Sequence, residues 1–238
     1  MPLDFAFLVL EEHPYGREML QKLLKNNLIP KLIIQESSAV ADEERDKFYE
    51  RMAGQPRPAE TATLAAEHNI PVEAVKNHNV EESRQMLEAL SPQLTVLGGT
   101  RIIKDYILSI PPRGTINAHP GLLPWLRGSA SVGWALYKDL PVGATVHFID
   151  PGIDTGDIIL REELPVHRDD TYETLNYRVT CLAAELMTKA VALFAAGEEI
   201  PRQPQDTSEG ETFRVIPADL LAEGVARLRE GRYSHYAE

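Results

Sequence analysis

The chain has 238 residues, of which 43% are hydrophobic and 25% are charged, and its formal net charge is −12. The length suits one large α/β domain with a small appendage, and the composition is typical of a soluble globular protein. The acidic charge, without a cluster of Lys and Arg, argues against a large nucleic-acid surface, and no apolar run approaches the length of a membrane-spanning helix.

Strands and helices alternate along the first hundred residues. Residues 1–10 are apolar, with no basic stretch before them and no small-residue cleavage site, so they predict a first strand and not a signal peptide. Strands are predicted at 5–10, 32–34, 70–75 and 94–97, and helices at 15–26, 59–69 and 81–90. The charged segment 39–51 predicts an exposed helix or a partly mobile excursion, with a turn at 54–58.

The second half of the chain continues the alternation. Strands are predicted at 115–118, 144–149, 157–164 and 212–215, and helices at 129–137, 170–196 and 218–229. We expect Asp170 to cap the long helix, with Glu173 as its capping-box partner. The polar, Pro-containing segment 201–210 predicts a linker, which divides a domain at 1–200 from a short C-terminal extension at 201–238.

The predicted fold is α/β: an open, mostly parallel sheet with helices on both faces and right-handed crossovers. Ligands of such sheets bind at the carboxyl ends of strands. The loops after Leu97, Ala118 and Ile149 are therefore expected to meet around one pocket.

Cysteine and histidine usage gives no sign of a metal site. The single cysteine, Cys181, excludes an internal disulfide and is interpreted as a small buried residue. Four histidines, at positions 13, 68, 78 and 167, have no ligand spacing and are interpreted as surface or loop residues. A reducing compartment fits this pattern, so we expect a cytoplasmic protein.

Asn117 and His119 follow an apolar strand and alternate with Ala118, so in extended geometry they face the same side. Pro120 biases His119 toward an extended conformation. Such a carboxamide and imidazole can donate two hydrogen bonds to one oxygen that becomes negative in a transition state. A structural pair in a loop is the alternative interpretation of these two residues.

A second segment, 143–157, runs from an apolar strand into a loop with Asp150, Asp154 and Asp157. The spacing does not match a calcium-binding loop. A partly buried aspartate beside a histidine can hold the imidazolium or accept a proton through water. The alternative is a turn with solvated acids.

The two segments together resemble the folate-dependent formyltransferase family. The resemblance is carried by Asn-x-His, then Leu122-Leu123-Pro124, then Arg127-Gly128, then an Asp-x-Gly-x-Asp-x-Gly-Asp loop at 150–157. It is close over residues 116–160 and implies the Rossmann-like formyltransferase fold, 10-formyltetrahydrofolate as co-substrate and no metal. It also implies that Asn117, His119 and Asp154 are catalytic.

The resemblance implies a role for each catalytic residue. Asn117 and His119, the latter as imidazolium, stabilise an oxyanion while an acceptor amine attacks the formyl carbon. Asp154 pairs with His119 and helps to remove the proton of the amine. In relatives, the backbone of the loop at 100–103 bonds to the pterin ring. By this resemblance, Arg101 and Ile103 bind the pterin and Thr100 lines its pocket. The other side of the pterin is covered by a loop made of Asp150, Pro151, Gly152 and Ile153.

Differences between this sequence and individual family members narrow the range of possible acceptor substrates. The loop after the first strand reads Leu10-Glu11-Glu12-His13-Pro14-Tyr15-Gly16, a poor phosphate cradle that disfavours glycinamide ribonucleotide. The C-terminal tRNA-gripping barrel of methionyl-tRNA formyltransferases and the N-terminal regulatory domain of the deformylases are not recognised. We therefore expect a small-molecule amine acceptor, with a nucleotide-linked amino sugar as nearest precedent, and neither nucleic acid nor membrane as partner.

Two other activities and one assembly question stay open. The same pocket, if it admits water but no amine, is that of a hydrolase that releases formate. A non-catalytic folate-binding module is disfavoured by the intact catalytic trio. The segment 37–58 and the tail from residue 201 are the expected carriers of acceptor specificity, and the tail is also compatible with a homodimer contact.

Overall fold

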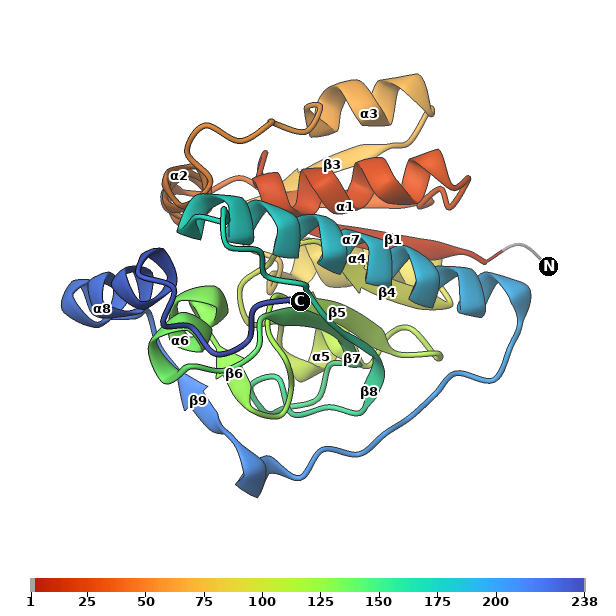
Figure 1. Cartoon of the computed structure of the whole chain (residues 1–238). Helices are drawn as coiled ribbons and strands as arrows, with labels where there is room; N and C mark the ends of the chain where they lie inside the picture. Colours follow the sequence, from red (N-terminus) through yellow and green to blue (C-terminus); the bar gives the residue numbers. More distant parts are fainter. Residues whose placement is uncertain (1–2, 238) are drawn as a thin grey trace.

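A seven-stranded sheet forms the centre of the protein, which the computed structural model describes over residues 3–237 (Figure 1). The strand order is β3-β2-β1-β4-β5-β7-β8. The strands are β1 (Phe5–Leu10), β2 (Leu32–Glu36), β3 (Val72–Val75), β4 (Leu94–Leu97), β5 (Thr115–His119), β7 (Gly143–Phe148) and β8 (Ile158–Glu163). Strands β1 to β5 pair in parallel, whereas β7 pairs antiparallel with both β5 and β8, which confirms the predicted mostly parallel α/β sheet.

Helices cover both faces of this sheet. One face carries α1 (Pro14–Lys25), α2 (Ala39–Arg51), α3 (Thr61–Glu67) and α7 (Tyr172–Ala196), and the other carries α4 (Glu81–Leu90) and α5 (Asp105–Leu108). Strand β1 shows why both faces are needed: Phe5, Phe7 and Val9 pack with α1 and α7, whereas Ala6 and Leu8 pack toward α4. A strand that is buried on both faces is expected to be a continuous apolar run.

The C-terminal extension returns to the domain and packs on it. Strand β9 (Glu211–Phe213) pairs in parallel with β6 (Leu126–Gly128) in a separate two-stranded sheet, next to the 3-10 turn η1 (Thr207–Glu209). Helix α8 (Ala218–Arg229) packs on α6 (Ser131–Lys138), with Leu136 and Leu228 in their shared core (Figure 1). Strand β6 and helix α5 are not predicted from the sequence, because they are too short to show a periodic pattern. The last strand is predicted at 212–215 and lies at Glu211–Phe213.

The start of α7 differs from the prediction. Thr171 is the N-cap, its hydroxyl accepts from the Thr174 N–H at 3.2 Å, and the Thr174 hydroxyl accepts from the Thr171 N–H at 2.8 Å. The predicted cap by Asp170 with Glu173 is therefore wrong. The Asp170 carboxylate instead accepts from the Thr174 hydroxyl at 3.0 Å and pairs with Arg178.

Helix α7 also corrects the expectation that no apolar run reaches membrane-spanning length. Among the described residues it is the one helix that is long and apolar enough, by length and composition, to cross a membrane. However, 61% of its most apolar window is buried. Its buried side chains pack with α1, β5 and β7, so core packing accounts for its composition.

The charged segment 39–51 is a regular helix, α2, that is held against α1. The Phe48 ring lies 4.9 Å from the His13 ring and 5.9 Å from the Tyr15 ring. Arg17 of α1 donates to the Ala59 carbonyl at 2.9 Å and so fixes the chain that leaves α2. His13 lies in the loop before α1, one of the two positions that the sequence predicted, and is buried there with 7% of its surface exposed.

Burial of His13 predicts a pH-dependent stability. Burial, together with smaller effects of the nearby charges of Arg51 and Arg45, lowers the pKa of His13 to about 3. The ring stays neutral in the folded protein, while the unfolded chain binds a proton below about pH 6.5. The contribution of the neutral His13 to the free energy of unfolding is therefore complete above pH 6.5. It decreases by about 1.4 kcal/mol per pH unit as the pH falls from 6.5 toward 3.

Chemical denaturation of the wild type and of His13→Asn between pH 6.5 and 4.5 measures this effect. We expect the free energy of unfolding to fall less steeply in the variant, by about 1.4 kcal/mol per pH unit. His167→Asn, at an exposed position, is the control and should keep the wild-type slope. Equal slopes for His13→Asn and the wild type would contradict a neutral, buried His13.

Candidate active site

One cavity of about 1150 Å³ is lined by most of the residues that the sequence singled out; His119 does not line it but contacts Asp154, which does. Its wall includes Asn117 and Asp154. The residues predicted to contact the pterin line the same cavity: Thr100, Arg101, Ile103, Asp150, Pro151, Gly152 and Ile153. The structure thus brings together three segments that lie far apart in the sequence, as the predicted sheet required.

The cavity lies at the carboxyl ends of β4 and β5, beside the point where the strand order changes direction. Strands β2 and β3 follow on one side of β1, whereas β4 and β5 lie on its other side, and such a switch point is the usual ligand site of an open sheet. The loop after β7 reaches the cavity differently, because β7 is antiparallel and ends beside Ile116 at the start of β5. From there the loop runs back far enough for Asp154 to contact His119 at the end of β5.

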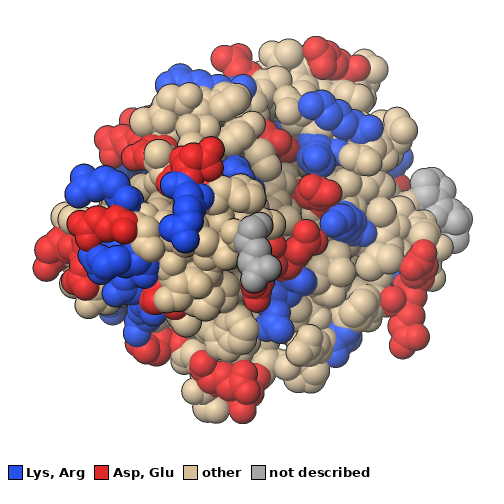
Figure 2. All heavy atoms as spheres, viewed as in Figure 1, with Lys and Arg blue, Asp and Glu red and all other residues tan. Residues whose placement is uncertain are grey.

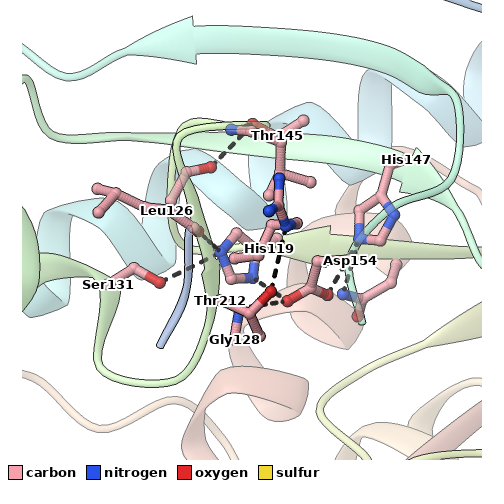
Figure 3. A network of polar contacts seen from close by, with 12 residues as sticks. His119, Leu126, Gly128, Ser131, Thr145, His147, Asp154 and Thr212 are labelled. Carbon is pink, nitrogen blue, oxygen red and sulfur yellow. Dashed lines mark hydrogen bonds and ion pairs between the residues drawn. The ribbon is translucent and has the colours of Figure 1, made fainter. Parts of the chain in front are cut away.

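His119 lies between two acceptors (Figure 3). Its Nε2 is 2.6 Å from the Leu126 carbonyl, and its Nδ1 is 3.3 Å from Oδ2 of Asp154. The Ser131 hydroxyl lies 3.2 Å from Nε2. Because each ring nitrogen faces an oxygen that accepts hydrogen bonds, the contacts suit the doubly protonated imidazolium.

The loop after β5 holds the Leu126 carbonyl in place. The Thr145 hydroxyl of β7 accepts from the Leu123 N–H at 3.1 Å and donates to the Gly121 carbonyl at 2.8 Å. Gly121 must lack a side chain, since a Cβ there would lie 2.7 Å from Nε2 of His119. The Leu-Leu-Pro segment of the motif therefore forms the back of the histidine site.

Asp154 is an ionised carboxylate with several partners. Its Oδ2 accepts from the Gly128 N–H at 2.8 Å, and its Oδ1 lies 3.5 Å from Nε2 of His147. Burial alone would raise the pKa of Asp154, but His119, His147 and the Gly128 N–H outweigh burial and hold the pKa well below its usual range. The backbone φ of Asp154 is 54°, in the left-handed region, a strained conformation of the kind found at functional sites.

For His119, in contrast to Asp154, the effect of burial on the pKa is larger than the effect of the neighbouring charge. Burial lowers the pKa of His119 below its ordinary value of 6.5, and the attraction of the Asp154 carboxylate opposes this effect without cancelling it. The ring therefore releases its proton more readily than a free imidazole. Such a group suits reversible proton transfer near neutral pH.

His147, a buried residue of β7, supports the site from within the core. It has none of its surface exposed and lies directly opposite Asn117 in the β5–β7 ladder. Its Nδ1 donates to the Phe148 carbonyl at 2.8 Å, which leaves Nε2 to face Asn117 Nδ2 at 3.4 Å and Asp154. The antiparallel register that creates this contact has no signal in the sequence.

The C-terminal extension completes one wall of the cavity. Its lining includes Thr212, Phe213, Arg214 and Val215. Gln205 donates to the carbonyls of Asp154 at 3.1 Å and Gly156 at 2.6 Å, so the extension also supports the loop that carries the Asp154 carboxylate. Within residues 3–237, no group of three or more His, Cys, Asp or Glu side chains is arranged to hold a metal ion.

Comparison with known proteins agrees with this geometry. The family described as formyl transferase matches residues 5–191. The methionyl-tRNA formyltransferase of Koribacter versatilis is 40% identical over 157 residues, which cover 64% of this chain and 49% of that protein. The chain thus spans about half the length of the curated relatives that it matches.

Solved structures with the same fold include two formyltransferases. Phosphoribosylglycinamide formyltransferase from Anaplasma phagocytophilum superimposes with a TM-score of 0.65 at 23% identity, over 83% of this chain and 89% of that one. A formyltransferase from Anoxybacillus kamchatkensis, in complex with UDP-4,6-dideoxy-4-formamido-L-AltNAc and tetrahydrofolate, gives a TM-score of 0.56 at 21% identity, over 88% and 86%. At these identities the likeness concerns the fold.

Arg127, a residue of the motif, holds the C-terminal extension through hydrogen bonds. Arg127 is buried, with 6% of its surface exposed. Its guanidinium donates to the carbonyls of Pro124 at 2.9 Å, Thr207 at 3.1 Å and Gly210 at 2.9 Å. Arg127→Met leaves these carbonyls without a donor, at a cost of about 1–3 kcal/mol. We expect hydrogen exchange of the amides in 205–213 to accelerate about tenfold or more, measured by mass spectrometry.

Arg229→Met, at an exposed position in α8, is the matched control and should leave the exchange of this segment unchanged. Exchange at the wild-type rate in Arg127→Met would show that the extension is held by other contacts.

Proposed function

Since the chain belongs to the formyl transferase family, we propose that it transfers a formyl group from 10-formyltetrahydrofolate to the amine of a small molecule. One observation carries the proposal: Asn117, His119 and Asp154 converge beside a single cavity, with the ionised Asp154 carboxylate 3.3 Å from the His119 ring. The same cavity, of about 1150 Å³, is lined by the loop at 100–106 and by residues 212–215 of the C-terminal extension.

The residues around the cavity suit a folate donor. 10-Formyltetrahydrofolate supplies the formyl carbon that the amine attacks. Backbone groups of Arg101 and Ile103 are offered to the pterin ring by a loop that makes no backbone-to-backbone hydrogen bond at 100–103 within the described chain. The loop Asp150 to Ile153 covers the other side, and its turn is fixed because Asp150 accepts from the Gly152 N–H and the Thr155 hydroxyl.

Asn117 and His119 stabilise the negative charge that develops on the formyl oxygen. Asn117 has two N–H groups on Nδ2; one faces His147, and the other remains for the oxygen. His119 adds the charge of its imidazolium. Each such preorganised donor contributes roughly 3 kcal/mol to the stabilisation of a transition state.

Asp154 takes up the proton that the acceptor amine loses. An amine attacks only in its neutral form, so a poised acceptor for its proton matters. Asp154 stays ionised near neutral pH and favours the charged form of His119 against the effect of burial, and it accepts the proton of the amine directly or through water.

For the acceptor, we propose an amine carried by a small molecule, with nucleotide-linked amino sugars as the leading class. The structural neighbour from Anoxybacillus kamchatkensis, whose complex contains a UDP-linked formamido sugar, supports this class. The loop after β1 gives no phosphate cradle: Glu12 accepts from the Thr61 N–H at 3.1 Å, and Glu11 accepts from the Ser37 hydroxyl at 2.6 Å. These two carboxylates would repel a ribonucleotide phosphate at that position.

The surface charge supports a small acceptor over tRNA. Figure 2 shows Lys and Arg interspersed with Asp and Glu over the face in view, and not gathered into one basic patch. With a net charge of −12, such a surface offers little attraction to a polyanion.

The proposal is tested by tetrahydrofolate release from 10-formyltetrahydrofolate, followed by absorbance, against a panel of amines that includes nucleotide-linked amino sugars. We expect release to depend on one class of amine. Asp154→Asn should lower kcat by more than about tenfold, because a general base contributes roughly 10² to 10⁴ to a rate.

Asp157→Asn is the control, since this carboxylate lies in the same loop but pairs with the exposed Arg202 at 3.4 Å. Its kcat should match that of the wild type. Formate release at full rate without any amine would assign the hydrolase instead, and a near-normal rate for Asp154→Asn would remove Asp154 from the mechanism.

A further inference from the structure

The loop after β3 lies behind the segment 100–104 and contacts its backbone directly. The side chain of Asn79 bonds to two peptide groups of that segment: Nδ2 donates to the Ile102 carbonyl at 2.9 Å, and Oδ1 accepts from the Lys104 N–H at 2.7 Å. These two groups flank Ile103. A single carboxamide thus replaces the hydrogen bonds that a neighbouring strand would give.

The segment depends on such support from outside. Residues 100–103 belong to no helix or strand and make no backbone-to-backbone hydrogen bond within residues 3–237. The Ile102 side chain is 77% exposed and gives little packing. A loop with this little internal bonding is expected to fluctuate unless side chains fix its backbone.

A second contact from the same region fixes Arg101. Its guanidinium lies 2.5 Å from the carboxylate of Glu36, a residue with none of its surface exposed. The other oxygen of Glu36 accepts from the N–H of His78 at 3.2 Å, and His78, in the loop after β3, is itself completely buried. Glu36 therefore ties Arg101 to the residue that precedes Asn79.

The Glu36 carboxylate is ionised where these contacts form. Its burial would raise the pKa, but the hydrogen bonds from His78, Ser38 and Arg101 outweigh burial and lower the pKa to about 2. The ion pair with Arg101 thus persists across the neutral pH range.

The bonds to Asn79 also determine which way Ile103 faces. In extended backbone, alternate residues direct their N–H and C=O groups to opposite sides. With the Ile102 carbonyl and the Lys104 N–H turned toward Asn79, the N–H and carbonyl of Ile103 turn to the opposite side, away from Asn79. Ile103 lines the cavity, so its peptide groups are available to a ligand there.

We propose that Asn79 is a positioning residue of the donor site, which fixes the backbone on both sides of Ile103 so that its N–H and carbonyl meet the heterocycle of the formyl donor. Asn79 itself is not among the residues that line the cavity. The proposal rests on the function proposed above, because it assigns the segment 100–104 to the donor.

Asn79→Asp tests this role with little change of shape. The aspartate still accepts from the Lys104 N–H, but it places a carboxylate oxygen against the Ile102 carbonyl where the amide had donated. We expect the KM for 10-formyltetrahydrofolate to rise about tenfold or more. The kcat at saturating donor and the KM for the acceptor amine should stay within about twofold of the wild type.

Asn26→Asp is the matched control, because the Asn26 amide also donates to a backbone carbonyl, that of Lys22 at 2.8 Å, but does so at the end of α1. Its donor KM should not change. Asn79→Ala, which removes both hydrogen bonds without adding charge, should raise the donor KM in the same direction. Thermal unfolding of each variant separates a local effect from a loss of the fold.

Calorimetric binding of tetrahydrofolate distinguishes failure of this inference from failure of the proposed function. Weaker binding to Asn79→Asp than to the wild type, at an unchanged melting temperature, supports the positioning role. Equal affinity in both proteins overturns it while leaving the donor assignment intact. Absence of binding to the wild type overturns the donor assignment and the role of Asn79 together.

Discussion

An ionised carboxylate held between two buried histidine rings is the constraint on which the site depends. Asp154 faces Nδ1 of His119 at 3.3 Å and Nε2 of His147 at 3.5 Å. A charge in this position is tolerable only with close partners, because desolvation disfavours the ionised form. The three segments that supply the partners, β5, β6 and β7, must therefore meet at one point. The left-handed backbone of Asp154 is the local strain that this meeting requires.

The rest of the protein supports that point from two sides. On the donor side, the loop after β3 and the buried Glu36 hold the segment 100–104 from behind, so that an irregular loop presents a defined backbone to the cavity. On the other side, Arg127 fixes the carbonyls of the C-terminal extension, and Gln205 reaches the backbone of Asp154. Functional loops on a rigid sheet commonly need such outer supports, because the sheet orients only the ends of its strands.

Much of the fold could be predicted from the sequence because its signals are local. Strand β1 is continuously apolar because it is buried on both faces, and the alternation of strands with amphipathic helices predicts a parallel sheet. Asn117 and His119 are correctly expected to lie on one side, since alternation in a strand requires it. The features that could not be predicted depend on contacts far apart in the chain. The β5–β7 register brings His147 opposite Asn117, and Arg17 holds the chain that leaves α2. At Asp170 a local signal misled, because its carboxylate pairs with Arg178 and leaves the cap to Thr171.

The central claim, that the Asp154 carboxylate favours the charged form of His119 against the effect of burial, is tested most directly by NMR titration of ¹⁵N-labelled histidine in the wild type and in Asp154→Asn. The account predicts a pKa for His119 below 6.5 in the wild type and a lower one in the variant, because burial remains while the opposing carboxylate is removed. A pKa that is the same in both proteins, or higher in the variant, would contradict the pairing of the two residues.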